Sequence, residues 1–380
     1  MNLRPSRIDE LQQLVRTTPR LTPKGGGSKW RIAAPPDGAV LVDMTAIRGV
    51  SAYDPAEFTF TARAGTPLTE IEALLAERGQ YLPFDPPRVA QGATLGGAIA
   101  AGWSGPSRLR YGGVRDFILG VKLIDGEGRL TGGGGRVVKN AAGFDLPKLL
   151  CGSRGRLGIL VELTLKVFPR PEAFASLRLR FADVAAAAER MRALMRSPLA
   201  PHALDLVAPV EGDDYALLVR TGGPREALAG VLARLETAAG QAGERLDSEQ
   251  DAALWLAQRE PFGAEPTAPL VRIQLLPAQV ERLDAFLQRL GAQRIFSLGG
   301  HLAWAALPQD ADWRALETGL AELGAVATIA RGGPPDRVVL NASASNPFAR
   351  RVKAALDPFE RFGPLDPAAD RSPAPAKGVG

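Results

Sequence analysis

Small residues fill one uncharged stretch in the first third of the chain. The run QGATLGGAIAAGWSGPS occupies Gln91 to Ser107, and no charged side chain occurs between Arg88 and Arg108. Gly, Ala, Ser and Thr predominate there over bulky apolar residues. A backbone without bulk lets a ligand come close to the peptide groups, and several free amides together can bind a diphosphate. The stretch therefore predicts a wall for a flat, phosphorylated cofactor.

Two further glycine-rich segments are candidates for phosphate binding. KGGGSK, from Lys24 to Lys29, places three glycines between two lysines, so free amides and positive charge occur together. A flexible turn is the less favoured alternative for this loop taken alone. GSRGRLG, from Gly152 to Gly158, runs directly into a strand-like segment that is rich in β-branched residues, Ile159 to Val167.

Two simpler explanations of the uncharged stretch are disfavoured. Its length is close to that of a membrane span, but its glycines, Gln91 and Pro106 make it a poor one. Close packing of a helix on a sheet explains some glycines but not the repeated Gly-Gly pairs. The commoner nucleotide motifs, G-x-G-x-x-G after a strand and G-x-x-x-x-G-K-[ST], do not occur, so neither a Rossmann site nor a P-loop is indicated.

Composition limits the class of protein. A chain of 380 residues with 46% hydrophobic residues can form about two domains. Its net charge of +5 comes from dispersed basic residues, which favours anionic ligands and disfavours nucleic acid. The single cysteine, Cys151, excludes internal disulfides and cysteine-rich metal or iron–sulfur sites. The first residues lack the apolar region of a signal peptide, so we expect a cytoplasmic chain.

The elements around these motifs alternate between helix and strand. Helices are predicted over 7–16, 68–78 and 146–150, and strands over 40–43, 58–64 and 159–167. Residues 117–124 and 129–131 form a predicted hairpin closed by Asp125 to Gly128, and Gly132 to Gly135 is interpreted as a surface turn. After Phe168-Pro169-Arg170-Pro171, strands and helices alternate over 174–181, 184–195, 204–207, 215–221, 225–239, 270–276, 278–290, 294–297, 302–307 and 313–323. This order indicates an α+β fold whose second half is an antiparallel sheet with helices on one face.

Six ordered motifs together resemble one known family. They occupy residues 23–30, 50–87, 92–97, 111–120, 139–153 and 155–171, and a shorter match lies at 356–364. They resemble the FAD-binding domain of the vanillyl-alcohol oxidase and p-cresol methylhydroxylase (PCMH) superfamily. Within it, they look most like the FAD-binding subunits of bacterial glycolate oxidases, which are relatives of the D-lactate dehydrogenases.

The resemblance implies a two-lobed FAD-binding domain over residues 1–170 and an α+β cap domain with an antiparallel sheet over 171–330. Residues 331–363 would return to the first domain, and 364–380, rich in Pro, Ala and charge, would be a disordered tail. The cofactor implied is non-covalent FAD. Its predicted contacts are Lys24, Gly25, Gly26, Gly27, Ser28, Lys29, Pro86, Gly92, Ala93, Thr94, Gly96, Gly97, Gly102, Ser104, Gly105, Tyr111, Gly112, Gly152, Gly155, Gly158, Ile159 and Val161.

The reaction that the resemblance implies is oxidation of a 2-hydroxy acid, such as glycolate or D-lactate, to a 2-keto acid. It needs the flavin N5 to take a hydride, a base for the hydroxyl proton and a cation for the carboxylate. The only histidines are His202 and His301, neither in the first domain, so histidyl attachment of the flavin there is impossible. His301 is the candidate base and Arg110 the candidate cation, and no metal site is expected.

Electrons from a reduced flavin need an exit, and one cysteine cannot build an iron–sulfur relay. The resemblance implies partners, a second flavoprotein subunit and an iron–sulfur subunit, with a peripheral position at the inner membrane through that complex. Three hypotheses stay open. The chain is the FAD-binding subunit of such a complex, an autonomous flavin dehydrogenase of a 2-hydroxy acid, or a non-catalytic structural subunit.

Overall fold

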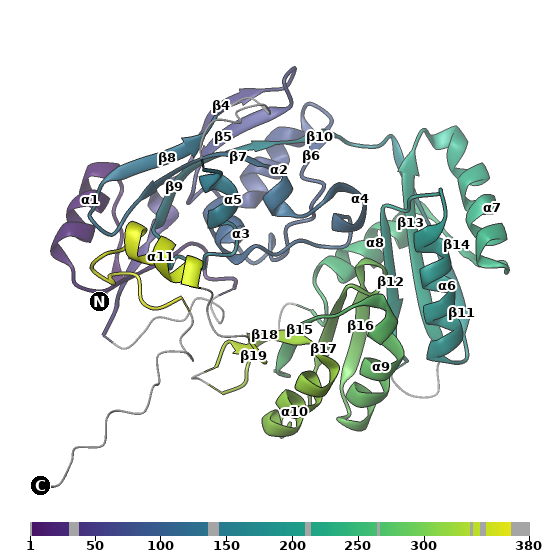
Figure 1. Ribbon diagram of the computed structural model, residues 1–380. Coiled ribbons are helices and arrows are strands. Elements are labelled where there is room, and N and C mark those ends of the chain that lie inside the picture. The colour runs from purple at the N-terminus through teal and green to yellow at the C-terminus, as the bar shows by residue number, and fades with distance from the viewer. Residues whose placement is uncertain are drawn as a thin grey trace, which may run out of the picture.

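The structure is a computed structural model that describes residues 2–29, 38–135, 144–209, 214–263, 267–334, 337–342 and 347–365. Two bodies lie side by side (Figure 1). We call the elements from β1 to β10, with helix α11, the FAD lobe, and the elements from β11 to β19 the cap lobe. Residues 30, 139–143 and 366–380, which carry parts of two predicted motifs and most of the predicted tail, lie outside the described residues.

A small parallel sheet opens the FAD lobe, in the order β1 (Asn2–Leu3), β3 (Val40–Asp43), β2 (Leu21–Lys24). Helix α1 (Ile8–Thr17) buries Leu11 and Val15 against it. Ile159 and Val161 of the larger sheet join the same apolar cluster. The loop after β2 is therefore anchored between two sheets, and this loop is the Lys24–Lys29 segment.

The larger sheet of the FAD lobe is antiparallel, in the order β4 (Val50–Asp54), β5 (Thr59–Arg63), β9 (Ile159–Lys166), β7 (Ile118–Ile124), β8 (Leu130–Gly134). Helices α2 (Leu68–Ala76), α3 (Leu95–Ala101) and α5 (Leu146–Leu150) share one apolar core with it. The short α4 (Arg108–Tyr111), β6 (Gln80–Tyr81) and β10 (Phe168–Pro169) complete the lobe.

The glycines after the predicted hairpin are strand, not turn. Strand β8 continues through Gly132, Gly133 and Gly134, which pair with Lys122, Val121 and Gly120. A Cβ on Gly132 would lie 2.5 Å from the Val121 carbonyl oxygen. A Cβ on Gly134 would likewise meet the β7 backbone, and one on Gly133 would lie 3.1 Å from Leu146 Cβ. The prediction of a surface turn is therefore wrong for residues 132–134, which are strand.

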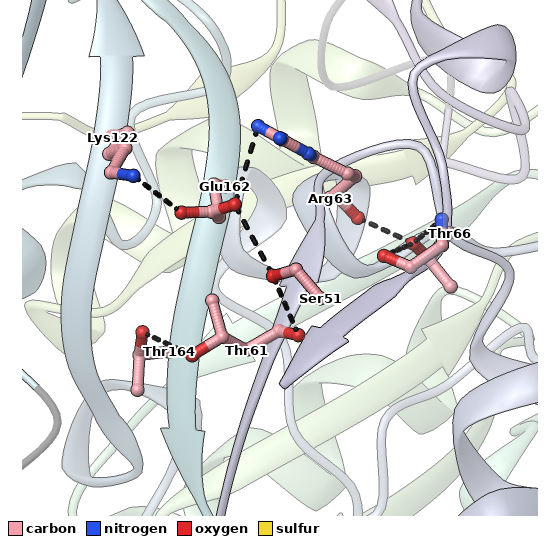
Figure 2. A network of polar contacts seen from close by, with 8 residues as sticks. Ser51, Thr61, Arg63, Thr66, Lys122, Glu162 and Thr164 are labelled. Atoms are coloured by element: carbon pink, nitrogen blue, oxygen red, sulfur yellow. Dashed lines mark hydrogen bonds and ion pairs between the residues drawn. The ribbon is translucent and has the colours of Figure 1, made fainter. Parts of the chain in front are cut away.

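Polar side chains on this sheet satisfy one another (Figure 2). Glu162 accepts the Lys122 ammonium at 2.8 Å and lies 3.3 Å from the Arg63 guanidinium, both on neighbouring strands. Thr61 and Thr164 share a hydrogen bond of 2.9 Å between the same strands. Burial alone would raise the pKa of Glu162, but Lys122 and Arg63 together hold it below its usual value. The polar residues thus stabilise the register of the sheet.

The cap lobe is one nine-stranded antiparallel sheet. Its order is β14 (Glu244–Leu246), β11 (Ala173–Phe181), β13 (Tyr215–Gly223), β12 (Ala203–Val207), β16 (Gln293–Ser297), β17 (Leu302–Ala306), β15 (Leu270–Gln274), β18 (Val326–Arg331), β19 (Val339–Leu340). Helices α6 (Val184–Arg196), α7 (Leu228–Ala239), α9 (Val280–Arg289) and α10 (Trp313–Leu323) bury a large core on one face. The predicted α+β fold with an antiparallel cap sheet is confirmed.

Helix α8 (Ser248–Arg259) lies on the other face of the cap sheet. Trp255 donates its indole N–H to Ser176 Oγ at 2.7 Å, and Ser176 alternates along β11 with Leu177, which belongs to the helix-covered core. The residues at the end of α8 reach the FAD lobe, where Arg259 pairs with Glu72 at 2.7 Å and Glu260 pairs with Arg88 at 3.4 Å.

The C-terminal helix α11 (Pro347–Leu356) packs back on the FAD lobe. The Gly126 N–H donates to the Leu356 carbonyl at 2.8 Å, and the Leu21 N–H donates to the Arg361 carbonyl at 2.7 Å. Phe362 is buried in the cluster around α1. None of the helices that the structure describes has the length and apolarity needed to cross a membrane.

Asp284 and Arg294 form a buried ion pair in the cap lobe, with Nε to Oδ1 at 2.7 Å and a hydrogen bond from Tyr215 to Asp284 at 2.7 Å. Asp284→Ala leaves a buried guanidinium without its carboxylate, so we expect a loss of about 3–5 kcal/mol in the free energy of unfolding. Urea unfolding measures it. The exposed Glu172–Arg225 pair is the control: Glu172→Ala should change the free energy by less than about 0.5 kcal/mol. Equal losses in both variants would contradict this account.

Candidate functional site

A cavity lies between the Lys24–Lys29 loop, helix α3 and the start of β9. The space between its walls is about 740 Å³, part of it open to solvent, which is within the range of cofactor pockets. Twelve of the predicted FAD contacts line it: Lys24, Gly25, Gly26, Gly27, Ser28, Lys29, Thr94, Gly96, Gly97, Gly155, Gly158 and Ile159. Segments far apart in the sequence therefore meet at one site, as the glycine pattern predicted.

The glycines of the loop are required by close packing. A Cβ on Gly26 would lie 1.7 Å from the Gly92 carbonyl oxygen, and one on Gly25 would lie 2.2 Å from Thr94 Oγ1. The backbone of the loop thus rests directly on residues 92–94. Gly92 and Ala93, which do not line the cavity, support the loop from behind.

Gly97 has a different environment from these glycines. Apart from its two chain neighbours and its own helix backbone, the only atom of the described residues within 4 Å of a Cβ placed there is Thr94 Oγ1, at 3.1 Å. Thr94 caps α3 by accepting the Gly97 N–H at 3.2 Å. Since Gly97 lines the cavity, its missing side chain leaves room for a ligand rather than for protein.

The other predicted contacts do not line the cavity. Gly102 ends α3 with a φ of 69°, and a Cβ on it would lie 3.0 Å from Gly152 Cα. A Cβ on Gly105 would lie 2.7 Å from that of Asp85, so it too meets protein. The full group outside the lining is Pro86, Gly92, Ala93, Gly102, Ser104, Gly105, Tyr111, Gly112, Gly152 and Val161. Their part in binding the cofactor stays a prediction.

Sequence reasoning missed seven lining residues: Pro23, Met44, Ala64, Ala100, Ala101, Arg154 and Leu160. Most are small or aliphatic residues that also suit an ordinary core. Ala100 and Ala101 lie inside the uncharged stretch, so its small-residue pattern could have found them. Arg154 adds a third basic residue to Lys24 and Lys29, and its backbone N–H donates to the Ala100 carbonyl at 2.9 Å.

Burial lowers the pKa of Lys29 to about 8; Arg88 and Arg259 lower it further, and Glu260 partly opposes them. A nearby anion would favour the charged ammonium. A bare peptide wall, three basic residues and aliphatic side chains such as Met44 and Leu160 fit a ligand with a diphosphate and a flat apolar part. The chemistry of the lining therefore fits FAD.

The two predicted catalytic residues lie outside the lining of the cavity. His301 is exposed at the end of a short turn, with Nδ1 2.9 Å from the Leu298 carbonyl oxygen. Arg110 donates to the Ala200 carbonyl at 2.7 Å and so joins α4 to the cap lobe. No group of three or more His, Cys, Asp and Glu in the described ranges could hold a metal ion.

The second histidine is an interdomain contact. His202 Nε2 lies 3.0 Å from the Tyr111 hydroxyl of the FAD lobe. Burial, with the charges of Arg110 and Arg220, lowers the pKa of His202 to about 3, so the ring is neutral near pH 7. Burial also raises the pKa of the Cys151 thiol to about 12, which fits a packed side chain rather than a reactive one.

Comparison with known proteins defines the class first. Residues 2–132 match the FAD binding domain family, which confirms FAD as the cofactor. Over 367 residues the chain is 34% identical to "Glycolate oxidase subunit GlcE" of Escherichia coli (strain K12), covering 94% of this chain and 95% of that protein. The chain belongs to this family of FAD-dependent oxidoreductases, so the predicted family and the predicted class of enzyme are confirmed.

The alignments with other relatives cover smaller shares of both proteins. The chain is 25% identical over 251 residues to "Glycolate oxidase subunit GlcD" of Bacillus subtilis (strain 168), spanning 61% of this chain and 53% of that one. It is 31% identical over 176 residues to the mitochondrial "D-lactate dehydrogenase [cytochrome]" of Arabidopsis thaliana, spanning 46% and 30%. Among solved structures, alkyldihydroxyacetonephosphate synthase shares the fold, with a TM-score of 0.71 at 17% identity over 96% of this chain and 75% of that one.

Gly97→Val should remove FAD from the purified protein. The new side chain would occupy the cavity, and overfilling a packed site costs about 1–3 kcal/mol, or roughly tenfold or more in affinity. Flavin absorbance per chain measures the content. Gly230→Val, in the exposed part of α7 with open space around it, carries a similar helix penalty and should keep its FAD. Unchanged flavin in the Gly97 variant would contradict the assignment.

FAD affinity should fall as the pH rises through about 8. Only the protonated ammonium of Lys29 attracts the diphosphate, and a bound diphosphate raises the pKa of that ammonium. The attraction is therefore complete below the pKa of Lys29 in the FAD-free chain, and it is lost as the pH rises above that value. Quenching of flavin fluorescence between pH 6.5 and 9.5 measures it. Lys29→Met should bind more weakly at pH 7 and lose this dependence. Lys148→Met, which removes an exposed ammonium that pairs with Asp145, should behave as wild type. A dependence unaltered in Lys29→Met would overturn the assignment.

Proposed function

We propose that this chain is the FAD-binding subunit of a glycolate oxidase complex that oxidises 2-hydroxy acids, such as glycolate or D-lactate, to 2-keto acids. The observation that carries the proposal is the cavity, where three segments of bare backbone and three basic residues converge. The names of the relatives support the substrate class, since they include two glycolate oxidase subunits, a D-lactate dehydrogenase and a D-2-hydroxyglutarate dehydrogenase.

Different residues of the chain would bind different parts of the cofactor and the substrate. Bound FAD supplies a ring whose N5 accepts a hydride from the carbon that bears the hydroxyl. Lys24, Lys29 and Arg154 would offset the charge of the diphosphate, and the amides of the glycine loop would donate to it. The open face of the cap sheet would cover the reacting end and keep water out. His301 as base and Arg110 as a cation for the carboxylate stay predictions.

The electrons need acceptors outside this chain. Cys151 is the only cysteine, so no iron–sulfur cluster is held here by cysteines of one chain. We therefore propose a second flavoprotein subunit and an iron–sulfur subunit as partners. The proposed location is cytoplasmic, at the inner membrane through those partners.

A second candidate is a subunit that binds FAD without oxidising substrate itself. The observation that favours it is that, within the described part of the chain, the residues lining the cavity include no His, Asp or Glu that could serve as a base. In that case the flavin would relay electrons or stabilise the complex. An autonomous dehydrogenase is the third possibility, and the same experiment separates all three.

Anaerobic titration of the purified chain with glycolate and D-lactate tests the proposal. We expect about one FAD per chain, released by acid or heat because it is non-covalent. We also expect the flavin to bleach fully and turn over only when the partner subunits are present. Rapid bleaching of the isolated chain by one acid would favour the autonomous dehydrogenase. Bound flavin that no 2-hydroxy acid reduces, with or without partners, would contradict substrate oxidation by this chain.

A further inference from the structure

Arg272 is a buried arginine on the face of the cap sheet that has no helix layer. It lies on β15, where its neighbours Val271 and Ile273 point into the helix-covered core, so its own side chain points to the opposite face. The residue is 7% exposed. Leu270, Leu302 and Trp304 belong to a smaller apolar cluster that does not include those helices.

One indole lies beside this guanidinium, and a second indole links it to the FAD lobe. Trp304 pairs with Arg272 across β17 and β15, with its ring centroid 6.0 Å from the guanidinium carbon. Trp103 of the FAD lobe meets Trp304 edge to face at 5.5 Å. Ala101 packs in the same cluster and also lines the FAD cavity. Arg272 is therefore connected to the cavity lining through Trp304, Trp103 and Ala101.

Arg272 has no anionic partner among the residues that the structure describes. Its Nε is buried and makes no hydrogen bond. Two other arginines of the cap lobe have carboxylate partners: the half-buried Arg220 pairs with Asp251 at 2.7 Å, and the buried Arg294 pairs with Asp284 at 2.7 Å. A buried charge without a counter-ion is costly, so proteins keep one where a ligand supplies the opposite charge.

The charges near Arg272 are also positive. Its pKa is lowered to about 10, chiefly by burial and further by the charges of Arg108 and Arg154. Arg154 lines the FAD cavity, so the positive field extends from the cavity to the cap sheet. A small anion between the two lobes would be stabilised by all three side chains.

We propose that Arg272 binds the carboxylate of the small hydroxy acid, between the two lobes and against the indoles of Trp103 and Trp304. This inference rests on the proposed function. A guanidinium matches a carboxylate in a planar, two-point contact, which a lysine cannot reproduce. The two indoles would give the carbon chain of the ligand apolar neighbours.

The test compares glycolate with glycolamide, which has the same shape without the charge. Each is titrated into the FAD-loaded chain, and binding is followed by the change in flavin absorbance and by calorimetry. Neither readout needs turnover. For the wild type we expect saturable binding of glycolate at least about tenfold tighter than that of glycolamide. This comparison needs no variant and therefore does not depend on the folding of one.

Arg272→Met should weaken glycolate binding about tenfold or more, leave glycolamide binding unchanged and keep the FAD content. Arg272→Lys keeps the charge and should fall between the two. Arg192→Met is the matched control, because Arg192 pairs with Glu281 on the helix-covered side of the cap lobe. It should bind glycolate as the wild type does.

The outcomes separate this inference from the function it rests on. Wild-type chain without flavin would overturn both. Flavin bound normally, with equal affinities for glycolate and glycolamide or an unchanged affinity in Arg272→Met, would overturn the inference alone. Loss of FAD in Arg272→Met and Arg272→Lys, with normal folding by circular dichroism, would also overturn it, because Arg272 would then serve the cofactor.

Discussion

The close contact between the Lys24–Lys29 loop and residues 92–97 is the constraint on which the site depends. The backbone of Gly26 rests against the Gly92 carbonyl with no room for a Cβ, and Gly25 rests in the same way against Thr94. Because protein fills the space beside those two positions, the loop backbone packs directly on residues 92–94. Gly97 is left open toward the cavity. Packing within the chain on one side of the loop thus leaves backbone without side chains on the side that faces the cavity.

The rest of the fold keeps that contact in place. The small parallel sheet anchors one end of the loop, and the core shared by α3 and β9 fixes the opposite wall. The end of α8 reaches across from the cap lobe, where Glu260 and Arg259 hold the segment around Pro86 and Arg88 and contribute to the field at Lys29. The C-terminal segment closes the lobe through Phe362. The cavity therefore depends on elements from both ends of the chain.

Much of this site could be predicted from the sequence because two backbone segments, or a backbone and a cofactor, can come close together only where side chains are absent. Such positions are occupied by glycine, which is visible in the sequence. The same reasoning had limits. Gly132 to Gly134 are glycines for a similar steric reason, but they lie in a strand, and composition alone does not tell a strand contact from a turn. Ala101 and Leu160 line the cavity yet look like core residues. Arg272 lies inside a strand, and only the packing of the two lobes shows that its side chain lies on the face of the cap sheet that meets the FAD lobe. Helix α8 has few apolar residues at helical spacing, since it packs mainly through Trp255, so its pattern does not predict it.

The central claim is that bare backbone and lysines hold a diphosphate, and calorimetry with two ligands tests it most directly. FAD carries the diphosphate, and riboflavin has the same ring system without it. The account predicts that FAD binds one per chain and at least about a hundredfold tighter than riboflavin, because the glycine loop and the basic residues would bind the diphosphate. Equal affinities for FAD and riboflavin would show that the glycine wall and its lysines do not bind the diphosphate, and would contradict the account.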